Sequence, residues 1–146
     1  MTKIIAIIGD GSSGKSTLIR HITGVARSGT VQLNTMSSEL VTVYVKTQAP
    51  QEPPTKILPD DLVEILNQHA QADYAILPFR IRGVGISPAF DEYLDSFRMA
   101  AHEIIEPVIF LQTEDTQNIS SYRLQSFLQE PSNVRSNNVK EVINFL

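Results

Sequence analysis

The sequence predicts a single α/β domain of three layers, in which helices cover both faces of a mainly parallel sheet. Three observations lead to this prediction. The chain has 146 residues, 42% of them hydrophobic, which suits one core. Continuous apolar runs, typical of strands buried on both faces, recur along it. Segments with helical spacing of apolar residues alternate with these runs, as expected for parallel strands joined by helices.

The N-terminal segment predicts a strand, a turn and a helix. Residues 4–8 are all apolar and mostly isoleucine, which favours a buried strand. A turn rich in glycine and serine follows at residues 9–14. The apolar residues of segment 15–22 then share one face of a predicted helix. This order is the first half of a β-α-β unit.

The middle of the chain predicts two strands, a loop and a helix. Residues 31–33 form a short strand, and residues 41–45 alternate and are rich in β-branched side chains. Residues 48–59 hold four of the eight prolines and therefore predict a long surface loop. Asp60 or Asp61 is expected to cap the helix that follows.

The C-terminal half continues the alternation. Its predicted elements are a strand at 74–77 that stops at Pro78, a helix at 90–101, the last clear parallel strand at 107–111, a helix around 119–128 and a helical segment at 138–146. The apolar stripe of the last segment, which includes Val139 and Ile143, predicts core packing or a terminal strand. A membrane-binding helix is not favoured, because Lys140 is its only basic residue.

One motif carries chemistry. Residues 9–16 fit G-x-x-x-x-G-K-[ST] at every fixed position, between a predicted strand and a predicted helix. Glycines let the backbone approach a phosphate closely, and the N-terminus of the helix adds a positive dipole. Lys15 would reach the β- and γ-phosphates as the catalytic residue, and the Ser16 hydroxyl would bind Mg²⁺. The predicted nucleotide-binding residues are Gly9, Asp10, Gly11, Ser12, Ser13, Gly14, Lys15, Ser16 and Thr17.

With this motif the chain resembles the P-loop NTPase superfamily, a resemblance that implies the P-loop NTPase fold and ATP or GTP with Mg²⁺. The Asp-x-x-Gly and Asn-Lys-x-Asp motifs of GTPases are not in the sequence, so ATP is expected. The order of elements beyond the motif is similar to that of the ParA/MinD ATPases and their small plasmid-stability relatives. This resemblance implies an ATPase or nucleotide switch in plasmid or phage DNA partition, stability or positioning. It also implies a homodimer or higher assembly and a DNA-bound adaptor protein as partner.

The chain departs from that family at two positions that bear on hydrolysis. Asp10 stands where the family has an additional lysine, and Leu77 and Pro78 stand where the Walker B aspartate is expected. Magnesium then needs another carboxylate or only water, and Asp10, Glu39 and Asp61 are the candidates. Weak hydrolysis, or none, is the expectation.

Two other functions remain open. A small P-loop kinase needs arginines near the transferred phosphoryl group. Arg80 and Arg82 follow the strand at 74–77, and Arg123 and Arg135 could come from a lid, although all four also suit a solvated surface. A degenerate P-loop domain that serves as a structural or assembly subunit is the third hypothesis.

Composition excludes several classes. The chain has no cysteine, so disulfide scaffolds and thiol catalysis are excluded. The net charge of −4 argues against a broad basic surface for nucleic acid. Residues 4–8 are too short for a signal sequence, and no apolar stretch approaches the ~20 residues of a membrane span. We therefore expect a cytoplasmic protein.

Overall fold

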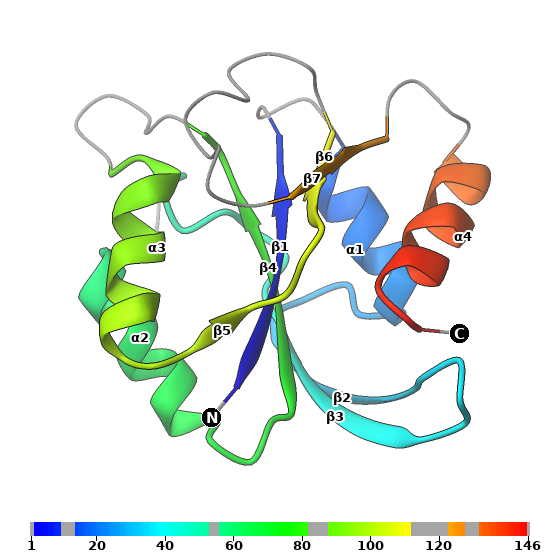
Figure 1. Ribbon diagram of the computed structural model, residues 1–146, viewed down its shortest axis with the longest axis horizontal. Coiled ribbons are helices and arrows are strands. Elements are labelled where there is room, and N and C mark those ends of the chain that lie inside the picture. The colour runs from blue at the N-terminus through cyan, green and yellow to red at the C-terminus, as the bar shows by residue number, and fades with distance from the viewer. Residues whose placement is uncertain are drawn as a thin grey trace.

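The computed structural model describes residues 2–9, 14–52, 56–81, 88–111, 123–127 and 132–145. These residues contain one sheet of seven strands and four helices (Figure 1). The strands are β1 (Lys3–Ile8), β2 (Gly29–Asn34), β3 (Leu40–Val45), β4 (Tyr74–Phe79), β5 (Glu103–Ile104), β6 (Val108–Phe110) and β7 (Leu124–Ser126). The helices are α1 (Lys15–Thr23), α2 (Pro59–Gln68), α3 (Phe90–Met99) and α4 (Ser132–Val142).

The sheet is mainly parallel, as predicted. Its order is β2-β3-β4-β1-β6-β7, with β5 pairing the first part of β1. β2 and β3 pair in antiparallel fashion, and the other paired strands run parallel. β1 thus lies in the middle, although it comes first in the chain.

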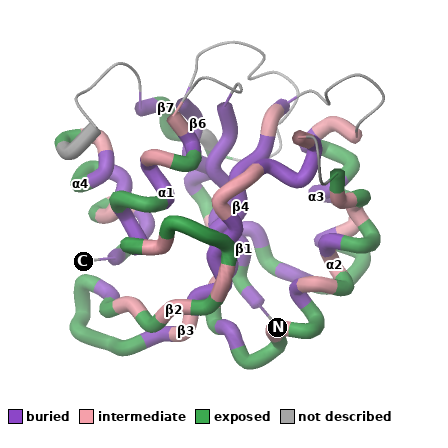
Figure 2. Tube along the Cα trace, turned by 180° about the vertical axis from the view of Figure 1, so that it is seen from behind, coloured by how far each residue is buried: buried purple, intermediate pink, exposed green. Residues whose placement is uncertain are grey.

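Helices cover both faces of this sheet. The side chains of β1 alternate, so that Ile4 and Ile8 pack with α2 and α3, whereas Ile5 and Ile7 pack with α1 and α4. Figure 2 shows the buried central strands between these helices. The fold is therefore α/β with a mixed sheet, and no helix in the described part of the chain is long and apolar enough to cross a membrane.

The prediction that Asp60 or Asp61 caps α2 is wrong. Leu58 is the N-cap residue and Pro59 is the first helical residue. Proline suits this position because its missing N–H has no helical partner there and its φ is already helical. Asp60 and Asp61 instead lie in the first turn, where their charges interact favourably with the helix dipole.

β4 does not stop at Pro78 but continues to Phe79. The Ile76 carbonyl accepts a hydrogen bond from Lys46 on the β3 side, and the Phe79 carbonyl accepts one from Gly9 on the β1 side. The backbone N–H and carbonyl groups of successive residues in a strand point to alternate neighbours. The nitrogen of Pro78 therefore faces the β3 side, but at a level beyond Val45, where β3 has already ended. The proline therefore removes no bond from the ladder.

The helix expected around 119–128 is wrong where the structure describes it, because Leu124–Ser126 forms β7. Its backbone pairs with β6, and Phe127 donates to the Phe110 carbonyl. Pairing with a neighbouring strand has overridden the helical spacing of the sequence. The strand predicted at 107–111 is present as β6, and β7 is a further parallel strand that the sequence analysis did not predict. Residues 112–122 lie outside the described part.

The C-terminal helix begins earlier than predicted, at Ser132. Val139 and Ile143 are buried against α1 in the core, which confirms that the apolar stripe serves packing. Beyond the helix, Phe145 forms a bridge to Thr35 and meets the Tyr74 ring edge-on.

Candidate functional site

The motif predicted from sequence lies at the carboxyl edge of the sheet, where parallel α/β sheets bind their ligands. Gly9 follows β1, and Lys15 begins α1. Gly14 is the N-cap residue of α1 and has φ 86°, a left-handed conformation that favours glycine. Between them, Asp10, Gly11, Ser12 and Ser13 lie outside the described residues, so their predicted contacts stay predictions.

The side chain of Lys15 is buried, with only 5% of its surface exposed. Its Nζ donates to the Gly9 carbonyl at 2.8 Å and lies 3.7 Å from Oε1 of Glu52. A buried ammonium needs such partners to compensate for lost water. The lysine thus folds back over the start of the loop that it follows.

Ser16 and Thr17 complete the described part of the motif. Ser16 is exposed, and its hydroxyl donates to the Thr47 carbonyl at 2.6 Å. Because a hydroxyl that donates keeps lone pairs, the Ser16 oxygen can still bind a cation. Thr17 is half-buried in the first turn of α1. No cluster of three or more His, Cys, Asp or Glu suited to a metal ion occurs in the ranges that the structure describes.

Glu52 is a residue of this edge that the sequence analysis missed. Its Oε1 lies between Lys15 and Arg80, whose Nε approaches it to 3.1 Å. The carboxylate is about a quarter exposed, so it is only partly screened by water. One signal could have identified it: Glu52 is the only acidic residue between β3 and α2, in a loop that must leave the carboxyl edge.

Gln51 fixes the loop that carries Glu52. Its side chain is fully buried and makes two hydrogen bonds with the backbone of Arg80. Nε2 donates to the Arg80 carbonyl at 2.7 Å, and Oε1 accepts from the Arg80 N–H at 2.9 Å. These bonds continue the pattern of a strand beyond the end of β4. They hold Glu52 next to Lys15 although Glu52 itself lies in no helix or strand.

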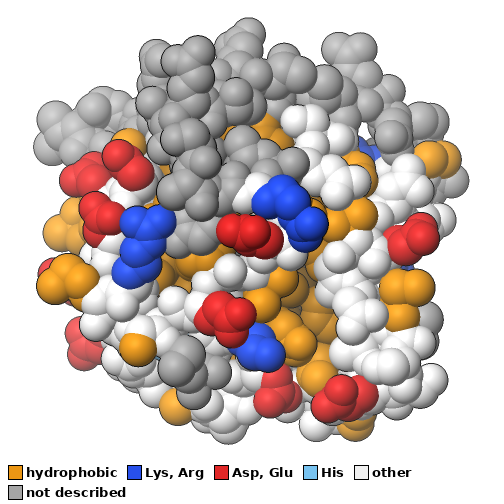
Figure 3. All heavy atoms as spheres, viewed as in Figure 1, with side chains coloured by type: hydrophobic (Ala, Val, Ile, Leu, Met, Phe, Trp, Pro, Cys, Tyr) orange, Lys and Arg blue, Asp and Glu red, His pale blue; other side chains and the backbone are white. Residues whose placement is uncertain are grey.

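Lys46, the first residue after β3, adds a third cation that interacts electrostatically with Glu52. Burial lowers the pKa of Lys46, and the negative charge of Glu52 opposes this shift. One carboxylate therefore interacts with Lys15, Lys46 and Arg80, so these four side chains together carry an excess of positive charge. The charge is local. On the face in Figure 3, the described basic side chains are interspersed with acidic ones and form no broad patch.

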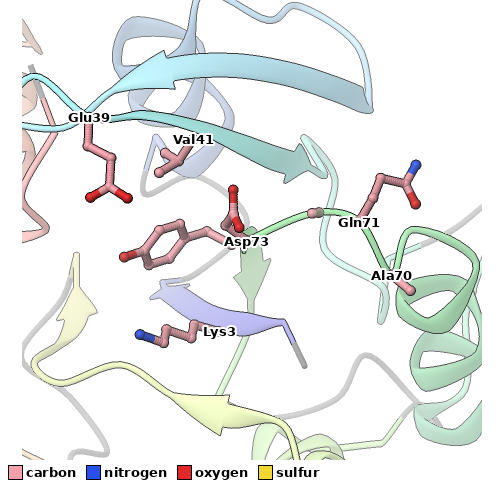
Figure 4. Close-up of a pocket in the computed structure, with 8 residues that line it drawn as sticks. Lys3, Glu39, Val41, Ala70, Gln71 and Asp73 are labelled. Carbon is pink, nitrogen blue, oxygen red and sulfur yellow. The ribbon is translucent and has the colours of Figure 1, made fainter.

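The structure brings neither Glu39 nor Asp61 to Lys15. Glu39 lies at the amino edge of the sheet, where it lines a pocket of about 290 Å³ together with Lys3 and Asp73 (Figure 4). Asp61 lines a different pocket, formed by α2, α3 and the residues before them. Both were candidates for a magnesium carboxylate. In these positions they are unsuited to that role.

The end of β4 carries no carboxylate in its described residues. Leu77, Pro78 and Phe79 are buried, and Arg80 and Ile81 follow. The position expected for a Walker B aspartate is therefore occupied by apolar residues, and the cation Arg80 follows them. Glu52 is the carboxylate that the structure places beside Lys15 instead.

The arginines considered in the sequence analysis take different positions. Arg80 lies at the carboxyl edge, paired with Glu52. Arg135, on α4, reaches Gly14: a Cβ atom at this glycine would lie 2.7 Å from its Nη2. Arg123 is exposed just before β7, and Arg82 lies outside the described residues.

Comparisons with protein-family models, with curated proteins and with solved structures found no match for this chain. The site must therefore be interpreted from its own residues.

Proposed function

We propose that this chain is a P-loop protein that binds ATP with Mg²⁺ at the carboxyl edge of its sheet. The proposal includes the three-layer P-loop NTPase fold. The observation that carries it is the position of Lys15, whose ammonium lies at the junction of β1 and the N-terminus of α1. In a chain that also matches the full motif, this position supports phosphate binding.

Binding follows from the groups around the motif. The first N–H groups of α1 have no partner within the helix and carry its positive dipole, so they favour an anion. Lys15 would exchange its contacts with Gly9 and Glu52 for phosphate oxygens. Each contact that it leaves is a hydrogen bond or ion pair that the phosphate must replace.

The available oxygens suit magnesium. Ser16 and Glu52 offer hydroxyl and carboxylate oxygens, which are the ligand atoms that Mg²⁺ prefers. Ser16 belongs to the motif, and Glu52 lies beside its Lys15. Mg²⁺ bound there would neutralise phosphate charge. The described residues at the end of β4 include no carboxylate, which supports weak hydrolysis or none.

The biological role rests on resemblance. We propose a ParA/MinD-like ATPase or nucleotide switch in plasmid or phage DNA partition, stability or positioning. It would form a homodimer or a higher assembly and bind a DNA-bound adaptor. A small P-loop kinase is the second candidate, because Arg80 and Arg135 supply two arginines near the motif. The third candidate is a P-loop subunit that does not hydrolyse nucleotide. It is supported by the described end of β4, which carries no carboxylate.

Replacing Lys15 tests nucleotide binding. Lys15→Ala is expected to weaken ATP binding by about 1–3 kcal/mol, the scale of hydrogen bonds to charged groups. Lys3→Ala is the matched control, since Lys3 is exposed at the amino end of the same strand and should leave ATP affinity unchanged. Isothermal titration calorimetry measures both. Equal ATP affinity in the Lys15→Ala variant and the unmodified protein would contradict the proposal.

Light scattering separates the candidate roles. The protein is measured without nucleotide, with ADP and Mg²⁺, and with a non-hydrolysable ATP analogue. A larger assembly in the ATP state alone supports the switch. A monomer in all three states, with nucleotide bound, favours the kinase and contradicts the switch.

A further inference from the structure

Lys46 is a buried cation at the carboxyl edge of the sheet, one residue beyond the end of β3. Only 9% of its surface is exposed. Its backbone N–H donates to the Ile76 carbonyl of β4, which fixes the start of the side chain beside the sheet. The carbonyl of the next residue, Thr47, accepts the hydrogen bond from the Ser16 hydroxyl. Lys46 therefore adjoins the motif, although it does not belong to it.

The Lys46 ammonium forms no hydrogen bond or ion pair in the part of the chain that the structure describes. Its interaction with the Glu52 carboxylate is electrostatic only. Lys15 is buried to a similar degree but donates to the Gly9 carbonyl at 2.8 Å. Burial of an ammonium without a hydrogen-bond acceptor is costly, and buried polar groups in proteins are for the most part paired. The position of Lys46 therefore favours a role in binding over a role in folding.

Arg80 presents further donors at the end of the neighbouring strand, β4. Its Nε contacts Glu52 at 3.1 Å, and within the described ranges its two terminal nitrogens form no hydrogen bond or ion pair. Two hydrogen bonds from the buried Gln51 side chain hold the backbone of Arg80. An ammonium and a guanidinium fork thus extend from adjacent strands, and both interact with the same carboxylate.

We propose that Lys46 and Arg80 form a phosphate-binding subsite at the ends of β3 and β4. The inference rests on the proposed function and adds to it two residues outside the motif. A phosphate group suits these side chains, because its oxygens accept from an ammonium and from a guanidinium fork at the same time. Mg²⁺ at Glu52, as proposed above, would weaken the hold of that carboxylate on both cations.

Two sources can supply this phosphate group. One is ATP itself, through its γ-phosphate. The other is a phosphorylated small molecule that binds next to the nucleotide, which would be the acceptor of a kinase. The two sources differ in one respect that can be measured: the γ-phosphate is present in ATP and absent from ADP, whereas a second molecule binds while the whole nucleotide is in place.

Replacing Lys46 tests the subsite. Lys46→Met keeps the length of the side chain and removes its charge, so it is expected to weaken binding of the phosphate group about tenfold. Lys56→Met is the matched control, because Lys56 is exposed before α2 and its loss should change no affinity. Isothermal titration calorimetry with Mg²⁺ measures ATP, ADP, and inorganic phosphate in the presence of a saturating non-hydrolysable ATP analogue.

The pattern of losses identifies the source. Weaker ATP binding in Lys46→Met, with ADP affinity unchanged, assigns the subsite to the γ-phosphate. Weaker binding of inorganic phosphate beside the analogue, with both nucleotides unaffected, assigns it to a second molecule. Unchanged affinities for all three ligands would overturn the inference. Equal losses for ATP and ADP would also overturn it, because Lys46 would then act on the motif and not at a separate subsite.

Thermal unfolding without nucleotide separates binding from folding. Because Lys46 has no described hydrogen bond to lose, its methionine variant should melt at no lower a temperature than the unmodified protein. A lower melting temperature with unchanged affinities would indicate a structural role and overturn the inference. If the variant does not fold, unchanged affinities in Arg80→Gln would overturn it equally. Unchanged affinities at Lys46 with a loss in Lys15→Ala would leave the proposed function standing, and unchanged affinities in both would contradict that function.

Discussion

The two edges of the sheet hold their charged residues in different ways. At the carboxyl edge, Lys15 is buried and shares Glu52 with Arg80. At the amino edge, Lys3 and Asp73 are exposed around an open pocket, and water screens their charges (Figure 4). The amino edge is marked by this pocket, whereas the carboxyl edge is marked by buried and linked charges. Partial burial strengthens electrostatic interactions, so the linked charges mark the candidate site better than the pocket does.

The largest expected effect concerns the two ends of α1. Gly14 and Gly24 both have positive φ, but a Cβ atom meets Arg135 only at Gly14. Both alanine variants strain the backbone, and we expect each to cost about 1–2 kcal/mol of folding free energy. Gly14→Ala should cost more than Gly24→Ala, because the guanidinium must also move. Urea denaturation at neutral pH measures the difference. Equal losses in the two variants would contradict the close contact with Arg135.

A smaller effect concerns the anchor of the loop that carries Glu52. The Tyr93 hydroxyl donates to the Ile57 carbonyl and so ties this loop to α3. Tyr93→Phe should cost about 1 kcal/mol of folding free energy. Tyr74→Phe, at the amino edge, is the comparison variant and should cost less.

Tyr93 also gives this anchor a pH dependence. Burial, with the Glu92 carboxylate adding to it, raises the pKa of Tyr93 from 10.0 to about 12. The stabilisation is complete below pH 10, where the unfolded tyrosine is protonated, and is lost as the pH rises from 10 to 12. Tyr93→Phe should remove that loss. Urea denaturation at pH 9, 10 and 11 tests it, and an unchanged slope would be evidence against the buried hydroxyl.

The smallest effect tests the pairing between Lys15 and Glu52. Glu52→Gln removes the carboxylate that competes with phosphate for Lys15, so ATP affinity measured without Mg²⁺ should rise by about 0.5–1 kcal/mol. Glu39→Gln changes an exposed carboxylate at the amino edge and should have no effect. Weaker Mg²⁺-free binding in the Glu52→Gln variant would show that this carboxylate does not compete.

The parts of the fold that sequence predicted are those specified locally. β1 and α1 follow from a run of isoleucines and the helical spacing after it, because both patterns lie within a few residues. Their position at the sheet edge then follows from general rules for parallel strands. The described motif residues were therefore found where the sequence analysis expected them.

The residues that sequence missed depend on contacts across long separations. Glu52 reaches Lys15 because Gln51 binds the backbone of Arg80, 29 residues away in sequence, and nothing in the proline-rich loop specifies that bond. The contact of Arg135 with Gly14 depends on how α4 packs against α1. β7 exists because β6 is available to pair with it. Such outcomes are set by the tertiary structure, which spacing in one chain does not encode.

The central position of β1 has a consequence for synthesis on the ribosome. Lys3 pairs with Tyr74, so this first strand has no partner on the β4 side until about 70 more residues have been made. At typical elongation rates of about 5–20 residues per second, the delay is roughly 4–14 s. During that time residues 4–8, which carry no charge and are mostly β-branched, remain unpaired in a nascent chain, and such segments are prone to aggregate. Chaperone binding to residues 3–8 in the emerging polypeptide would protect the strand that later becomes the centre of the sheet.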